Sequence, residues 1–211
     1  MAKISKRTLT GIIVAVVIVG VFGFKWVSSL SVKSIDPVAA RAKGNPQARV
    51  QVVEFIDFEC PACAHGAKLL KEYLSKHPED IHVQVKYFPL TGHHRHAMPS
   101  ALYSECAGRQ GKFWEFDDLV IAAQSQWSPL ISAEPLFDEF ARQTGLDMDK
   151  LKTCIASPDV SKMIMDERSV GASLGIKSTP TYFINNKMVV GTQSLTDAMN
   201  TYFPSQSVPS P

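Results

Sequence analysis

The sequence has almost no net charge. Its 22 Lys and Arg residues against 20 Asp and Glu residues give a formal charge of +2. Three of these cations precede a hydrophobic run near the N-terminus, so the rest of the chain has a charge of about −1. Proteins that bind nucleic acids gather positive charge to neutralise phosphates. We therefore expect no nucleic-acid partner.

Cysteine is also scarce, with four residues in 211. A structural zinc site usually needs four ligands, and Cys60 and Cys63 supply two, while Cys106 and Cys154 stand alone rather than as a second CxxC pair. The histidines that could complete a metal site are His65, His93, His94 and His96. A His-rich surface turn is the commoner explanation of such a cluster. We predict no metal site and keep metal binding as the weaker alternative.

A hydrophobic run near the N-terminus indicates export. Cations precede the uncharged residues 8–24, and Lys25-Trp26 closes the run. Such a segment extends about 25 Å as a helix, near the lower limit for crossing a bilayer. The positive-inside rule places the N-terminus in the cytoplasm. We predict a signal anchor at 1–27, crossing a bacterial cytoplasmic (inner) membrane once with the catalytic part on the periplasmic side. Cleavage near 29–31 is the alternative.

Composition divides the rest of the chain into three parts. Residues 28–47 are rich in Ser, Pro and Gly without a hydrophobic period, which predicts a flexible tether. Residues 48–203 are long enough for one domain with a hydrophobic core. The Pro/Ser-rich end, 204–211, is predicted to be a disordered tail.

Hydrophobic periodicity within 48–203 predicts an α/β fold. The strand signal disappears between the second strand and a late hairpin, where apolar residues follow helical spacing instead. This pattern indicates a sheet interrupted by a helical insertion. The expected elements are a strand at 50–58, a helix after residue 60, a strand at 81–90, a helical block at about 97–175, a hairpin at 180–191 and a helix at 195–202.

The sequence Cys60-Pro61-Ala62-Cys63 follows the first strand and opens the first helix. Pro61 suits the first helical position, where its missing N–H group costs nothing. Free N–H groups and the positive end of the helix dipole then favour a thiolate at Cys60. We predict that Cys60 is the exposed nucleophile and Cys63 the shielded resolving thiol. A purely structural disulfide is the alternative, but so short a loop removes little unfolded-state entropy.

Cys106 and Cys154 are predicted to form a separate structural disulfide. Both residues fall on apolar faces of expected helices in an oxidising compartment, and no other partner is left for either. Two buried free thiols are the alternative.

Three motifs in order, 58–63, 106–114 and Ser178-Thr179-Pro180-Thr181, make the chain similar to the DsbA-like thiol:disulfide oxidoreductases. The resemblance implies a thioredoxin fold with a helical insertion. It also implies that Pro180 is a cis-proline packed against the CxxC motif. The backbone of Thr179 would then pair with an extended substrate, beside Pro61 and Ala62.

The resemblance further implies that Glu54, six residues before Cys60, is a buried acid that moves protons to and from Cys63. Lys86 is the expected partner of Glu54, although a solvated charge is the simpler interpretation of each. Ala62 departs from the family's best-known member, which has a histidine at that position. The strongly lowered thiol pKa and the redox potential of that family member therefore do not transfer directly to this chain.

These inferences predict an enzyme that exchanges disulfides with exported, cysteine-containing proteins and most simply introduces them. Its own dithiol serves as the redox group, without a further cofactor. The resemblance implies a quinone-linked membrane partner that reoxidises the dithiol. The alternatives are a reductase or isomerase of the same fold, or a non-catalytic chaperone or metal carrier.

Overall fold

The structure is a computed structural model, and it describes residues 37–204. The predicted anchor at 1–27 and nearly all of the predicted tail lie outside these residues. Within 37–204, every helix is too short or too polar to cross a bilayer. The elements are α2 (Pro37–Ala40), β1 (Ala42–Gly44), β2 (Val50–Ile56), α3 (Pro61–Lys76), β3 (Ile81–Tyr87), α4 (Ala97–Gly108), α5 (Phe113–Ala122), α6 (Gln124–Trp127), α7 (Glu134–Gln143), α8 (Met148–Ile155), α9 (Pro158–Ser173), β4 (Thr181–Ile184), β5 (Lys187–Val190) and α10 (Thr192–Tyr202).

A mixed sheet of five strands, in the order β1-β3-β2-β4-β5, organises this part of the chain. The two central strands, β2 and β3, are parallel, and α3 connects them. The predicted hairpin is confirmed, because β4 and β5 pair antiparallel around Asn185 and Asn186, both of which have positive φ. Asparagine tolerates that backbone region better than most residues do.

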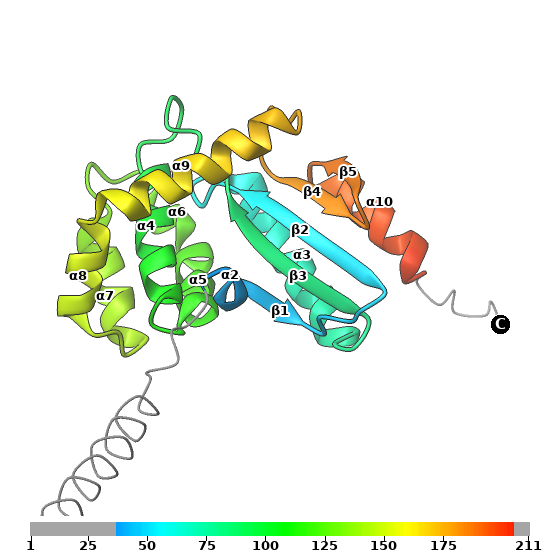
Figure 1. The fold of residues 1–211 in the computed structure, drawn as a ribbon, viewed down its shortest axis with the longest axis horizontal. Coiled ribbons are helices and arrows are strands. Elements are labelled where there is room, and N and C mark those ends of the chain that lie inside the picture. The colour runs from blue at the N-terminus through cyan, green and yellow to red at the C-terminus, as the bar shows by residue number, and fades with distance from the viewer. Residues whose placement is uncertain (1–36, 205–211) are drawn as a thin grey trace, which may run out of the picture. The chain divides into compact units, whose positions relative to one another are not determined.

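The two faces of the sheet are covered by different helices (Figure 1). Val52 and Val83 face α3 and α10, in a core that also contains Leu70 and Leu195. On the other face α9 packs close to the sheet at Gly171, where an added Cβ would lie 2.8 Å from the Phe88 ring. A larger side chain at this position would push α9 away from the sheet.

The predicted helical block at about 97–175 contains α4 to α9, of which α9 covers the sheet and α4 to α8 form the insertion between β3 and α9 (Figure 1). Their core is built around Trp127, Phe116 and Phe137, which are fully buried. A disulfide between Cys106 on α4 and Cys154 on α8 joins two helices of this block, as the sequence predicted.

The folded domain begins earlier than predicted, since 37–47 is not wholly a tether. Strand β1 pairs antiparallel with β3, and the Trp114 indole donates to the Ala42 carbonyl over 3.2 Å. Arg41 is fully buried and forms ion pairs with Glu105 at 3.4 Å and Glu167 at 2.8 Å. This segment lacks a hydrophobic period because polar contacts, rather than apolar side chains, attach it to the sheet.

Candidate active site

The two CxxC cysteines lie where strand β2 passes through a short turn into helix α3. Cys60 is the residue that caps α3, and Pro61 is its first residue. The backbone N–H groups of Cys63 and Ala64 donate to the Cys60 carbonyl at 3.0 and 3.2 Å. Helix α3 therefore begins directly after Cys60, as the spacing of the motif predicted.

The environment of Cys60 favours its thiolate. The hydrogen bond with the Cys63 thiol lowers the pKa of Cys60 to about 5, burial acts in the opposite direction, and Thr179 and the amides of Ala62 and Cys63 lower it further. Cys60 Sγ also lies 3.5 Å from the Thr179 carbonyl oxygen. Cys60 is thus the thiol that is ionised at neutral pH.

Cys63 has the opposite character. It is fully buried, whereas Cys60 keeps 9% of its surface exposed. Burial raises the pKa of Cys63 well above its usual value, and the hydrogen bond and charge of Cys60 add to this effect. Both thiols are free in the structure. Both cysteines are thus buried, and Cys60, which the sequence predicted to be exposed, is the less buried of the two and the one that favours the thiolate.

The loop before β4 approaches the cysteines from the other end of the chain. The Thr179–Pro180 peptide bond is cis, as the resemblance implied. Thr179 presents its carbonyl to Cys60, and the Pro180 carbonyl accepts a hydrogen bond from Gly191 at 2.9 Å. This loop therefore lies against the reactive sulfur.

Gln124, which the sequence did not single out, connects the helical insertion with the active-site turn. Its buried side-chain amide donates to the carbonyls of Phe58 at 2.6 Å and of Cys60 at 3.0 Å. Since it lies more than sixty residues from this turn in sequence, no local motif could have indicated its role. The insertion thus helps to fix the position of the cysteines.

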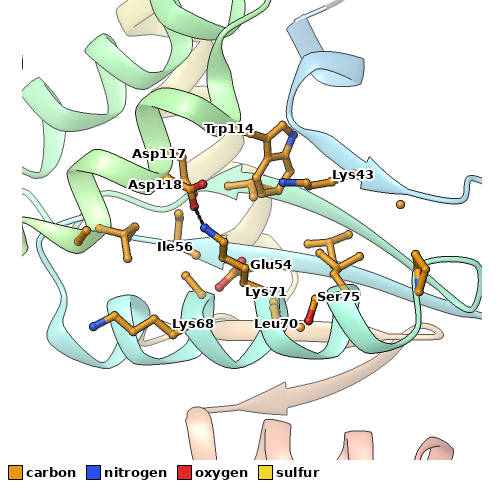
Figure 2. A pocket seen from close by; sticks show the side chains of 18 residues that line it. Lys43, Glu54, Ile56, Lys68, Leu70, Lys71, Ser75, Trp114, Asp117 and Asp118 are labelled. Carbon is orange, nitrogen blue, oxygen red and sulfur yellow. Dashed lines mark hydrogen bonds and ion pairs between the residues drawn. The ribbon is translucent and has the colours of Figure 1, made fainter. Parts of the chain in front are cut away.

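Glu54 points from β2 into a cavity of about 540 Å³ between the sheet, α3 and α5 (Figure 2). Asp117 of α5, another buried carboxyl that the sequence did not indicate, lines the same cavity. Burial raises the pKa of Glu54 to about 8, the charge of Asp117 contributes, and the Tyr182 hydroxyl acts in the opposite direction. Burial and the charge of Asp118 raise the pKa of Asp117 to about 7, against the charges of Lys43 and Lys71.

Tyr182 of β4 lies opposite Glu54 in the sheet. Its hydroxyl is buried without a hydrogen-bond partner and lies against Gly66 of α3, where an added Cβ would be 1.9 Å away. Burial raises the pKa of Tyr182, and the charges of Glu54 and Cys63 raise it further. Tyr182 therefore lies close to both the buried acid and the buried thiol.

Lys86 is not the partner of Glu54, and that expectation is wrong. In the parallel pairing of β2 with β3, Lys86 lies beside Phe55, while Glu54 lies beside Val85. Neighbouring residues of a strand point to opposite faces, so Lys86 extends toward α9 and binds Glu167 at 3.0 Å. Asp117, rather than Lys86, is the ionisable residue that acts on the pKa of Glu54.

The candidate metal ligands do not assemble. Across residues 37–204, no group of three or more His, Cys, Asp or Glu side chains is arranged to hold a metal ion. His94 contacts Asp57 at 2.8 Å, while His96 Nε2 lies 2.9 Å from the Leu130 carbonyl oxygen. These two members of the histidine turn therefore face different surroundings.

Several known proteins are similar to this chain. Residues 38–201 match the family model described as thioredoxin. A Na(+)/H(+) antiporter, NhaA 3 of Salinispora tropica, is 31% identical over 72% of the chain, which covers 22% of the antiporter. The chain spans about a quarter of the length of the curated relatives it matches.

Solved structures show the same fold at low sequence identity. Wolbachia pipientis α-DsbA1 superimposes with a TM-score of 0.67 at 21% identity, over 76% of this chain and 87% of α-DsbA1. Pseudomonas aeruginosa DsbA2 gives a TM-score of 0.60 at 23% identity, over 81% of this chain and 97% of that protein. Because the family model spans most of the sequence, the chain belongs to the thioredoxin family, and it has the DsbA-like architecture in which a helical block interrupts the sheet.

Proposed function

We propose that the protein is a thiol:disulfide oxidoreductase that introduces disulfides into exported proteins. The observation that carries this proposal is the contrast between the two cysteines, with a pKa of about 5 for Cys60 and a strongly raised pKa for Cys63. A stable Cys60 thiolate is a good leaving group, so a disulfide that contains Cys60 is readily given away. α-DsbA2 of Wolbachia pipientis, which shares the fold, is described as a thiol-disulfide exchange protein.

The reaction starts from the Cys60–Cys63 disulfide. A substrate thiolate attacks Cys60 Sγ, forms a mixed disulfide and expels Cys63 as a thiolate. Because the buried Cys63 strongly favours its neutral form, it takes up a proton, and Glu54, which is protonated below its pKa of about 8, is the donor that we propose. A second substrate thiolate then attacks the substrate sulfur and releases the Cys60 thiolate. The substrate loses two electrons, which the dithiol holds.

The Thr179–Pro180 loop is the proposed substrate-binding element. Its carbonyl at Thr179 faces Cys60, so a peptide that is bound beside the loop would present its sulfur to Cys60. Pro61 and Ala62, at the start of α3, border the same sulfur. Extended peptides pair with exposed backbone in this way in other protein complexes.

The cellular setting extends this proposal. The hydrophobic run at 8–24 anchors the enzyme in the bacterial inner membrane, with the domain on the periplasmic side, where disulfides persist. Newly exported cysteine-containing proteins are the substrates. A quinone-linked membrane partner accepts the two electrons and regenerates the disulfide.

The test is the oxidation of a reduced disulfide protein by the oxidised enzyme. Cys60→Ser should abolish the reaction, and Cys63→Ser should accumulate mixed disulfides through Cys60. The Cys106→Ala/Cys154→Ala double variant is the matched control and should retain the reaction. We expect a potential between about −120 and −230 mV against glutathione.

Two outcomes would replace this proposal. A potential near −270 mV, together with a pair that is reduced in cells, would indicate a reductase. Stoichiometric zinc binding, with neither insulin reduction nor oxidation of substrates, would indicate a metal carrier. The activity of the antiporters that contain a similar segment is not part of the proposal, because the chain matches only a fraction of their length.

A further inference from the structure

The loop between β3 and α4 places one histidine beside the active-site turn. His94 keeps 23% of its side chain exposed, and its Nδ1 lies 2.8 Å from Asp57 Oδ2. The backbone N–H of the neighbouring His93 donates to the Leu90 carbonyl at 2.8 Å. His94 therefore has a defined position relative to the cysteines.

Asp57 fixes that position. Its side chain is fully buried, and besides His94 it accepts hydrogen bonds from the backbone N–H groups of Glu59 at 2.8 Å and Leu90 at 2.7 Å. The Asp57 carbonyl accepts a hydrogen bond from the Cys60 N–H at 3.0 Å. One residue thus holds both the turn that carries Cys60 and the loop that carries His94.

The charges that act on His94 are all negative. Burial alone would lower the pKa of His94, but the hydrogen bond and charge of Asp57, together with the charges of Glu59 and Cys60, raise it. Because the His94 ring and the Cys60 backbone both bind Asp57, the imidazolium lies on the side of the turn that carries the Cys60 thiolate. A cation placed there stabilises the thiolate in turn, because electrostatic interaction is mutual.

We propose that His94, held by Asp57, supplies the positive charge that stabilises the Cys60 thiolate, from a loop outside the CxxC motif. The position between the cysteines is occupied by Ala62, which carries no charge. His94 is a positioning and electrostatic residue, and no bond to it forms or breaks. The inference rests on the proposed function, since it concerns the same thiol.

The interaction between the His94 imidazolium and the Cys60 thiolate acts on both groups. If His94 stabilises the thiolate, then the thiolate stabilises the imidazolium, and the disulfide, which has no charge, does not. The pKa of His94 must therefore be higher in the reduced protein than in the oxidised protein. NMR titration of the His94 ring in both redox states measures this difference without any assay of activity.

The experiment compares His94→Gln with His93→Gln in the full chain. Glutamine retains a donor for Asp57 but removes the charge, and His93, an exposed neighbour in the same loop, is the matched control. The Cys60 thiolate is titrated by ultraviolet absorbance, and the equilibrium with glutathione is measured. We expect His94→Gln to raise the pKa of Cys60 by about half a unit to one unit, a three- to tenfold fall in the ratio of thiolate to thiol. His93→Gln should change neither quantity.

A second variant separates charge from structure. His94→Lys restores a cation at the same position and should return the pKa of Cys60 toward the wild-type value. If His94→Gln leaves that pKa unchanged, or if the His94 titration is the same in both redox states, the proposal is overturned. The pKa of Cys60 and the titration of His94 are measured without a substrate protein. If the protein failed to oxidise substrates but His94→Gln still raised the pKa of Cys60, the proposed function alone would be refuted.

Discussion

Two groups of buried carboxyls among residues 37–204 differ in whether a cation forms an ion pair with them. Near α9, Glu105 and Glu167 surround Arg41, and Lys86 also binds Glu167. Although burial opposes it, the hydrogen bonds and charge of Arg41 lower the pKa of Glu167. In the cavity beneath α3, Glu54 and Asp117 have raised pKa values instead.

This difference in pKa gives the two groups of carboxyls different roles, one structural and one chemical. A buried carboxylate with a cation stays ionised at neutral pH and holds two elements together. A buried carboxyl without an ion pair stays protonated up to about neutral pH, and so it can give a proton to a neighbouring group. The charged group attaches the segment around Arg41 to the sheet, while the neutral pair lies on the Cys63 side.

Removal of the central cation should have the largest effect on stability. Arg41→Met leaves two carboxylates buried near α9 without their main partner, and we expect a loss of about 3 to 5 kcal/mol in the free energy of unfolding. Denaturant unfolding measures this loss. The control is Lys162→Met, which removes an exposed partner of Asp166 and should cost less than about 1 kcal/mol. Equal losses in the two variants would contradict the distinction between the buried and exposed pairs.

Loss of the Cys106–Cys154 disulfide tests whether the helical block is separable from the active site. The bond closes a loop with a sequence separation of 48 residues, for which the chain-entropy model gives about 4 kcal/mol. The double alanine variant should unfold at lower denaturant concentration and keep its Cys60–Cys63 exchange. Lost exchange at unchanged stability would make this pair a second redox centre.

The unpaired carboxyls should make the protein less stable as the pH rises. The folded pKa of Glu54, about 8, is above the ordinary value of 4.5, so the folded state binds more protons between these values. The contribution of Glu54 to the free energy of unfolding is therefore fully present below about pH 4.5 and is lost as the pH rises toward 8. At pH 7 the loss is about 3 kcal/mol. Glu54→Gln should remove about half of this slope in unfolding measurements, because Asp117, whose pKa is raised to about 7, contributes the rest. A slope that persists unchanged would show that Glu54 is not a titrating group.

The smallest effect is expected for the hydroxyl beside Glu54. Tyr182→Phe removes a buried hydroxyl without a hydrogen bond, so stability should change by less than about 1 kcal/mol. Tyr103→Phe is the contrast, since that hydroxyl donates to Asp138 at 2.8 Å and its removal should cost about 1 kcal/mol. A larger loss for Tyr182→Phe than for Tyr103→Phe would reveal a hidden partner of Tyr182.

Local patterns predicted the elements whose signal lies within a few residues. The strand before Cys60, the helix after it and the hairpin at Asn185 follow from side-chain period and turn residues. The contribution of 37–47 was missed, because β1 has only three residues and is attached by polar contacts. The prediction that Lys86 is the partner of Glu54 failed for a different reason. The alternation of side chains along one strand does not reveal the register of that strand against the next one.

The sequence by itself determined which of the two thiols would have the lowered pKa, because the helix N-terminus, the proline and the spacing of the cysteines are all local. Only the tertiary structure decided which groups surround that thiol. Thr179, Gln124 and His94 come from three separate segments of the chain. Their electrostatic effects depend on distance and burial, and neither quantity exists until the sheet, α3 and the helical block have packed together.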